Sequence, residues 1–157
     1  MRLAGLLLVA LAASGCNPPP QAMPPKSEVS PREAEVRKFI NTYFESWSAR
    51  DMASYGRTFH TRARIWFTNQ APMEKDQAPM EKEPFLQSQR RAHASSQFQM
   101  KEVPLSVEVT IKGNLAHVNV YWELDRGPER VRGYDFFTLV FADRRWQIIA
   151  LVFNQES

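Results

Sequence analysis

Apolar residues recur along the first third of this chain with the spacing of one helix face. Between residues 31 and 50 they fall three or four positions apart, at Val36, Phe39, Ile40, Tyr43, Phe44 and Trp47. Such a stripe is typical of an amphipathic helix that packs against a core. The preceding sequence Ser30-Pro31-Arg32-Glu33 indicates a capping box with proline in the first turn. The pattern therefore predicts a long helix over residues 31–50.

The helical spacing continues briefly after this helix and then gives way to a strand. Asp51 can cap a second, shorter helix in which Met52, Tyr55 and Phe59 keep the same period. Residues 63–67, with the sequence Ala-Arg-Ile-Trp-Phe, are rich in residues that favour extended structure and predict the first strand.

A seven-residue sequence is then repeated in tandem. Residues 70–76 have the sequence QAPMEKD and residues 77–83 have the sequence QAPMEKE. Two copies with a proline in each cannot sustain a heptad-repeat helix, so we expect a loop lengthened by duplication. A third helix is predicted over residues 84–94, and its inner side carries Phe85, Leu86, Gln89 and His93.

The last third of the chain alternates apolar and polar residues. The alternation is clearest where Ala116, Val118, Val120, Trp122 and Leu124 occupy every second position. This period predicts strands with one buried face. Strands are expected at 97–112, 115–125, 130–142 and 145–154, with turns at 113–114, 126–129 and 143–144. Helices followed by such strands predict an α+β fold, with a mostly antiparallel sheet curled around the long helix.

The N-terminal segment resembles a bacterial lipoprotein signal peptide. Arg2 is followed by an apolar stretch over residues 3–13 and then by Ser14-Gly15-Cys16. The resemblance implies cleavage before Cys16 and attachment of diacylglycerol to its sulfur. The stretch is shorter than the roughly 20 residues that a spanning helix needs. A plain secretory signal gives no reason for a sole cysteine at the cleavage point.

Three regions follow from this interpretation: a signal peptide (1–15), a proline-rich tether (16–30) and one domain (31–157). The tether favours an extended, semi-rigid conformation that holds the domain off the membrane. We expect the mature protein in the cell envelope, anchored outside the cytoplasmic membrane by acyl chains such as palmitate on Cys16. Asn17 in place of aspartate favours the outer membrane, by resemblance to enterobacterial sorting rules.

Composition narrows the function classes further. The chain has 20 basic and 17 acidic residues, a net charge of +3 that becomes +2 once Arg2 is removed with the signal peptide, and this small excess does not favour nucleic acid. His60, His93 and His117 fall in different predicted elements, so no metal site is expected. We expect no cofactor, because there is no glycine-rich phosphate loop. Four Trp, four Tyr and ten Phe indicate a bulky core or an aromatic cavity.

The order of several short motifs resembles the nuclear transport factor 2-like superfamily, especially its SnoaL-like and ketosteroid-isomerase-like branches. The motifs are 47–51 (WSARD), Phe59, the start of the strand at 63–65, 135–140 (DFFTLV) and 146–148 (WQI). The resemblance covers residues 32–154. It implies a cone-shaped fold whose hollow binds a small apolar molecule in some members, carries catalysis in others and is a packed core in many.

The same resemblance implies roles for two polar residues. Tyr43 falls where the isomerases have an oxyanion-hole tyrosine, and Asp135 falls where they have a protonated aspartate. Their catalytic base corresponds to Phe67, which cannot accept a proton. The resemblance thus implies a hollow that binds a polar oxygen and does not move hydrogen between carbons.

Strand alternation supports the environment of Asp135 independently. It places Asp135 on the same face as its apolar neighbours Val131, Gly133, Phe137, Leu139 and Phe141. A carboxyl group among such residues loses solvation, which raises its pKa. An alternative interpretation is that Asp135 only forms a hydrogen bond with a core tyrosine or tryptophan.

These observations lead to one main hypothesis, a non-catalytic lipoprotein whose domain binds a small, mostly apolar ligand. Tyr43 and Asp135 would recognise one polar oxygen, and the duplicated loop would cover the mouth. The walls of the pocket would be formed by Trp47, Phe59, Trp66 and Phe67.

Two other functions stay open at this point. One is a cyclase or isomerase that uses ionised Asp135 as its base. The other is a packed domain without a hollow, which would bind an envelope protein through its outer sheet. His117, Asn119 and Tyr121 mark that outer face, which in the superfamily often forms a dimer contact, and they predict a homodimer.

Overall fold

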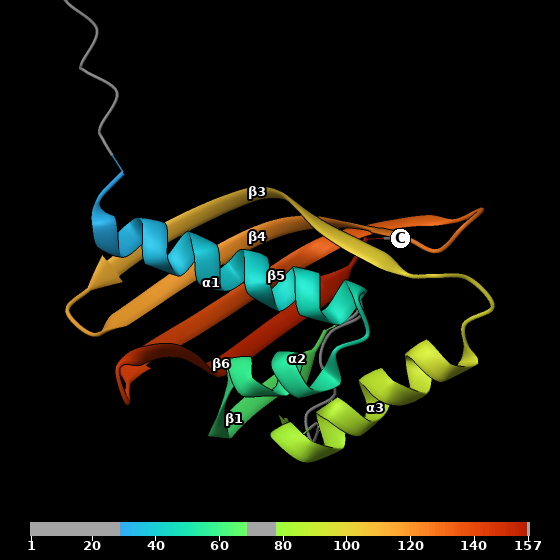
Figure 1. Ribbon diagram of the computed structural model, residues 1–157, viewed down its shortest axis with the longest axis horizontal. Helices are drawn as coiled ribbons and strands as arrows, with labels where there is room; N and C mark the ends of the chain where they lie inside the picture. Colours follow the sequence, from blue (N-terminus) through green and yellow to red (C-terminus); the bar gives the residue numbers. More distant parts are fainter. Residues whose placement is uncertain (1–28, 69–77, 157) are drawn as a thin grey trace, which may run out of the picture.

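The computed structural model describes residues 29–68 and 78–156, and its helices cover one face of a curved sheet (Figure 1). The six strands found there are ordered β2-β1-β6-β5-β4-β3, and all neighbours are antiparallel except β1 and β6. This confirms the α+β prediction. The elements are α1 (Pro31–Ser48), α2 (Met52–Thr58), β1 (Phe59–Phe67), β2 (Met80–Glu81), α3 (Lys82–Ser95), β3 (Lys101–Lys112), β4 (Leu115–Asp125), β5 (Arg130–Ala142) and β6 (Arg145–Gln155).

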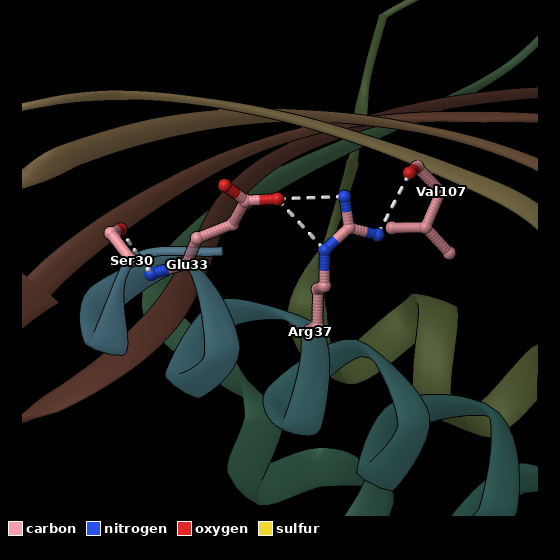
Figure 2. A network of polar contacts seen from close by, with 4 residues as sticks. All are labelled: Ser30, Glu33, Arg37 and Val107. Atoms are coloured by element: carbon pink, nitrogen blue, oxygen red, sulfur yellow. Dashed lines mark hydrogen bonds and ion pairs between the residues drawn. The ribbon is translucent and has the colours of Figure 1, made fainter. Parts of the chain in front are cut away.

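Helix α1 begins where the capping sequence predicts and is tied to the edge strand β3. The Ser30 hydroxyl accepts the backbone N–H of Glu33 at 3.2 Å. The Glu33 carboxylate does not return to Ser30 as in a full capping box; it accepts two hydrogen bonds from the Arg37 guanidinium, at 2.7 and 2.9 Å. Arg37 also donates to the carbonyl of Val107 on β3 at 2.9 Å (Figure 2). One arginine therefore links the first turns of α1 to the sheet.

The boundary between α2 and β1 differs from the prediction. Phe59 was expected in the helix, yet it is the first residue of β1, four residues before the predicted strand start at Ala63. The reason is tertiary pairing: β1 runs parallel to β6, and Phe59 lies opposite Ile148. The 3.6-residue spacing of Phe59 was a local signal that this long-range pairing overrides.

The sequence predicts a loop for the second copy of the duplicated sequence, but the structure shows a strand and the start of a helix there. Met80 and Glu81 form the short strand β2, which pairs with Ile65 and Arg64 of β1. An ion pair of 3.1 Å between Arg64 and Glu81 accompanies this pairing. Helix α3 then begins at Lys82, within the repeat. The first copy lies outside the described residues, as do the signal peptide, Cys16 and most of the tether.

The core lies between the helices and the inner face of the sheet. Its fully buried members include Val36 and Ile40 of α1, Val118 of β4, Leu139 of β5 and Ile148 of β6. Helix α1 crosses this face, while α2 and α3 lie beside it towards β1 (Figure 1). Within the described ranges, no helix is both long and apolar enough to cross a membrane.

The outer face of the sheet carries a row of aromatic rings. Tyr121 and Tyr134 have centroids 4.8 Å apart, and Tyr134 stacks on Phe136 at 6.2 Å. Phe136 is 46% exposed. His117 and Asn119 lie on the same face, since they alternate with the buried residues of β4. The homodimer predicted for this face stays a prediction.

Candidate functional site

A cavity of about 400 Å³ lies at one end of the inner face, between the C-terminal half of α1, helix α3 and the sheet. Its presence rules out the alternative of a domain without a hollow. Aromatic rings form a large part of the lining and belong to Tyr43, Trp47, Tyr55, Phe85, Trp122 and Phe153. Polar side chains form another part and belong to Gln89, Glu102, Arg126, Asp135 and Gln155.

Asp135 lies on the cavity lining with only 3% of its surface exposed. The indole N–H of Trp122 donates to its Oδ1 at 2.8 Å, so the alternative interpretation, a hydrogen bond with a core tryptophan, is also met. Oδ2 has no hydrogen-bond partner among the described residues. Burial raises the pKa of Asp135 to about 7, although the bond from Trp122 acts in the opposite direction. At neutral pH the carboxyl is therefore present in both forms.

Gly133 allows the indole to reach this carboxyl group. Trp122 and Gly133 are cross-strand partners on β4 and β5. A Cβ atom at position 133 would lie 2.4 Å from Cζ2 of Trp122 and 2.0 Å from the carbonyl oxygen of Asn154. The indole thus occupies the space that any side chain would fill, and it points its N–H at Asp135, two residues further along β5.

Two tyrosines form a second polar group beside the cavity. The Tyr55 hydroxyl on α2 donates to the Tyr43 hydroxyl on α1 at 3.0 Å, and both residues are almost fully buried. Burial is the main cause that raises the pKa of both phenols well above the ordinary value, so both are neutral. One hydrogen bond between two hydroxyls uses one of their two protons, so the pair retains one phenol proton that can be donated elsewhere.

Glu102 is a second acidic residue of the cavity, and sequence reasoning missed it. Regular alternation from Val107, Val109 and Ile111 places Glu102 on the outer face of β3. A bulge between Pro104 and Ser106 shifts the register by one residue and turns Glu102 inward, opposite Leu124. The proline inside a strand pattern was the available signal, because prolines in sheets occur at edges and bulges.

The electrostatic setting of Glu102 resembles that of Asp135. Burial raises the pKa of Glu102 well above its ordinary value, and the nearby Asp135 adds to this effect. The Arg126 guanidinium lowers the pKa of Glu102 in turn. Two carboxyl groups that are both disfavoured as anions therefore line one cavity, a common setting for binding and acid-base groups.

Trp47 is held at the cavity by α3. Its indole N–H donates to Oε1 of Gln89 at 2.9 Å, and its ring contacts the His93 ring with centroids 4.4 Å apart. Burial lowers the pKa of His93, with a further contribution from the charge of Arg50. His93 is thus a neutral packing residue on the inner side of α3, as its spacing indicated.

The other expected wall residues lie outside the lining. Phe59 is buried behind it, with its ring 6.0 Å from Tyr43 and 5.3 Å from Tyr55. Trp66 alternates with the buried Ile65, which directs it to the opposite face of the sheet. Phe67 packs on Phe153 with centroids 5.0 Å apart, so it supports a lining ring from outside.

The structure groups no set of metal ligands within residues 29–68 and 78–156. His60 accepts the backbone N–H of Arg62 at 3.1 Å, and His117 lies 3.4 Å from the hydroxyl of Thr138. The cavity can therefore bind an organic molecule through ring contacts and hydrogen bonds, and its two acids can also exchange protons.

Solved structures with the same fold come from several bacteria. An NTF2-like protein of unknown function from Pseudomonas putida has a TM-score of 0.68 at 14% identity, over 78% of this chain and 85% of that one. A protein of unknown function with a cystatin-like fold from Nostoc punctiforme has a TM-score of 0.65 at 12% identity, over 82% and 95%. At such identities the likeness shows the fold alone, and it confirms the predicted NTF2-like fold.

Comparison with curated proteins finds no match. The family profile described as "Putative lumazine-binding" matches residues 31–154, which is nearly the whole domain. The match includes all the helices and strands described above, apart from the last residue of β6. The chain therefore belongs to the family described as "Putative lumazine-binding".

Proposed function

We propose that this domain is a non-catalytic binding protein for a small planar aromatic molecule with a polar edge, held at the cell envelope by a lipid on Cys16. The observation that carries the ligand part is the position of Tyr43 and Asp135. Tyr43 presents a hydroxyl of the hydrogen-bonded tyrosine pair, and Asp135 presents Oδ2, unpaired among the described residues, to a cavity bordered by aromatic rings.

Size and lining support a flat ligand. A volume of about 400 Å³ is at the lower end of the range for small-molecule sites. Rings from α1, α2, α3 and the sheet surround it, which favours stacking and edge contacts with another ring. The polar residues among them make the site less apolar than the sequence hypothesis supposed.

Tyr43 and Asp135 provide two donors for one ligand oxygen. The hydrogen bond between the Tyr43 and Tyr55 hydroxyls uses one of their two protons and leaves the other to donate to a ligand. In its neutral form Asp135 can donate from Oδ2, because Trp122 occupies Oδ1. Donors that are already oriented in a cavity bind a carbonyl oxygen with little reorganisation.

The family description adds a candidate for the ligand itself. Lumazine is a planar bicyclic heterocycle with carbonyl oxygens and N–H groups along one ring. It offers both features that the cavity favours, a flat aromatic surface and a polar edge. We therefore take lumazine as the first ligand to test.

The binding test is a fluorescence titration of the mature domain with lumazine. We expect saturable binding and a loss of about tenfold in affinity for Tyr43→Phe and for Asp135→Leu, since each removes a hydrogen-bonding group from the ligand oxygen. Tyr134→Phe is the matched control, because Tyr134 lies on the outer face. No lumazine binding by folded protein, or equal losses for all three variants, would overturn the ligand proposal.

The membrane anchor rests on the sequence of residues 1–16 and has its own test. Cells that express the full chain are grown with labelled palmitate, and the protein is recovered from the envelope fraction. We expect label in the wild type and none in Cys16→Ala, which also stays unprocessed because the lipidated cysteine is needed for cleavage. Label in both proteins would contradict the anchor.

A second candidate function is an enzyme that moves protons at carbon. The observation that favours it is the pair of acids with raised pKa, Glu102 and Asp135, because such groups are suited to general acid-base catalysis near pH 7. A β,γ-unsaturated ketone tests it. Formation of the conjugated ketone by wild type and not by Asp135→Asn would support the enzyme; no product would support pure binding.

We also propose that two copies associate through the aromatic row on the outer face. An exposed phenylalanine at the end of a row of rings on one sheet face favours burial against a partner. Light scattering is expected to give a dimer for the wild type and a monomer for Phe136→Lys. A monomeric wild type at high concentration would contradict this association.

A further inference from the structure

We propose that Glu102 is a second ligand-binding residue of the cavity and that it recognises a cyclic amide edge, in which an N–H donor lies beside a carbonyl acceptor. This inference rests on the proposed binding function and names the chemical class of ligand: neutral lactam or imide heterocycles.

The backbone of Glu102 is fixed by the end of α1. The Ser48 hydroxyl accepts the backbone N–H of Glu102 at 2.9 Å and donates to its carbonyl oxygen at 3.1 Å. Together with the bulge beside Pro104, this clamp keeps the side chain directed inward. The hydrogen bonds with Ser48 and the bulge therefore position Glu102. A glutamate that faced solvent on an edge strand would need neither.

The carboxyl of Glu102 is free to bind a ligand. Asp135 has one oxygen occupied by Trp122, whereas the Glu102 side chain makes no hydrogen bond or ion pair with any described residue. Both acids line the same cavity, Glu102 from β3 and Asp135 from β5. Two oxygens of one carboxyl group are therefore available side by side.

Protonation decides which ligand edge this carboxyl fits. A neutral carboxylic acid has an O–H donor beside a carbonyl acceptor, which is the complement of a cyclic amide. A carboxylate only accepts, so it repels the amide carbonyl oxygen. Burial and the charge of Asp135 favour the neutral form of Glu102 by raising its pKa, and Arg126 opposes them.

The groups around Glu102 also select against charged ligands. Tyr43 and Tyr55 face it from the helices as neutral phenols, and Asp135 faces it from β5. Arg126, at the end of β4, is the described cation on the cavity lining. Its charge disfavours an organic cation, while the two acids on the lining disfavour an anion.

A comparison of two ligands distinguishes recognition of the amide edge from simple occupation of the cavity. Lumazine has the amide edge, and lumazine methylated on both pyrimidine-ring nitrogens keeps the ring and the oxygens but has no N–H on that ring. We expect the wild type to bind lumazine at least about tenfold more tightly than the methylated compound, because the edge forms two hydrogen bonds with Glu102.

Variants at position 102 test the residue itself. Glu102→Gln keeps a donor beside an acceptor, so we expect it to preserve the preference for lumazine. Glu102→Leu removes both and is expected to bind the two compounds with similar affinity. Glu108→Gln is the matched control, since Glu108 lies on the same strand opposite Asn119 of the outer face, and it should behave as wild type.

The pH dependence gives an independent readout. As pH rises, wild-type Glu102 loses its proton and lumazine binding weakens, whereas Glu102→Gln has no such proton to lose. Both proteins are titrated with lumazine from pH 5 to pH 8. The ionisation of lumazine and the presence of Asp135 are common to both, so they cancel in the ratio of the two affinities. We expect the ratio of their affinities to shift at least about threefold towards the glutamine variant.

The outcomes are distinct. Equal affinity of wild type for both compounds, or a glutamine variant that loses the preference, overturns the role of Glu102 and leaves the proposed function standing. Failure of both compounds to bind folded wild-type protein overturns the proposed function and this inference with it. If Glu102→Leu does not fold, as judged by circular dichroism, the glutamine variant and the two compounds still decide.

Discussion

The inner face of the sheet has two ends with opposite character. At the end where Arg32 lies 5.2 Å from the Phe141 ring, the inner positions are apolar, and Ile40 and Leu139 have no exposed surface. At the other end the same strands carry Trp122 and Asp135 around a cavity. One alternating pattern therefore builds a stable core and, a few residues further along, a polar site.

The two ends also differ in how much they contribute to the stability of the fold. Burying aliphatic side chains stabilises the fold, whereas burying carboxyl groups beside a hollow does not. The raised pKa of Asp135 and Glu102 is the signature of that cost. Binding sites commonly give up stability in this way.

The apolar end near Phe141 should contribute more to the stability of the fold than the cavity end. Ile40→Ala leaves a hole in a fully buried part of the core, and we expect the free energy of unfolding to fall by about 4 kcal/mol. Tyr43→Phe, one turn along the same helix, removes one hydroxyl and should cost about 1 kcal/mol. Urea denaturation of both variants checks this. A larger loss for Tyr43→Phe would reverse the roles assigned to the two ends.

The junction of Trp122 with β5 should be nearly as sensitive. Gly133→Ala places a Cβ where the indole and the Asn154 carbonyl lie, and we expect a loss of about 3 kcal/mol through overpacking. Gly56→Ala is the control, because its nearest neighbour is a flexible leucine tip at 3.0 Å, Cδ1 of Leu86. Thermal unfolding of the two variants separates them. Equal stability would show that the indole does not need this space.

The cavity end should make stability depend on pH in an unusual direction. Asp135 has a higher pKa in the folded protein than in the unfolded chain, so the folded state binds the proton more tightly. Stability is therefore greatest below the unfolded pKa and falls as pH rises towards 7. We expect a loss of roughly 2 kcal/mol between pH 5 and pH 7 from this group.

Asp135→Asn isolates that contribution. Glu102 acts in the same direction as Asp135, while His93, whose pKa is lowered by burial, acts in the opposite direction. The difference between wild type and variant removes the contribution of His93 and leaves that of Asp135, together with the part of the Glu102 shift that Asp135 causes. We expect the difference between the urea midpoints at pH 5 and pH 7 to be smaller in Asp135→Asn than in the wild type. The same divergence in both proteins would mean that Asp135 does not titrate in this range.

A turn far from the cavity should give the smallest effect. Asp143 and Arg144 join β5 to β6 with φ angles of 52° and 60°, a left-handed conformation that favours asparagine and glycine. Arg144→Gly is expected to stabilise the protein by about 1 kcal/mol and to leave lumazine affinity unchanged. A destabilised variant in thermal unfolding would contradict this interpretation of the turn.

Local sequence patterns predicted the helices and strands that bury one of their faces. The stripe from Val36 to Trp47 and the alternation in β4 both correspond to observed elements, because burial of one face dictates their period. The turns at 113–114 and 143–144 also lie where short polar sequences indicated them. Asp135 is buried for the same reason, as its position in an alternating strand predicted.

The remaining features depend on contacts between distant segments. β1 starts early because it pairs with β6, and Met80 of the repeat is extended because it pairs with β1. Glu102 enters the cavity through a bulge that changes the side-chain alternation, which a strict period of two cannot express. Trp66, an expected wall residue, lies on the other face because it alternates with the buried Ile65.

The most direct test of the account is a titration of the Asp135 and Glu102 carboxyl carbons by NMR in the protein without ligand. We predict a midpoint of about 7 for Asp135 and a midpoint for Glu102 that is also above its usual range and falls in Asp135→Asn. Midpoints for both groups at the ordinary values of exposed carboxyls, near 4, would contradict a buried acid pair in this cavity.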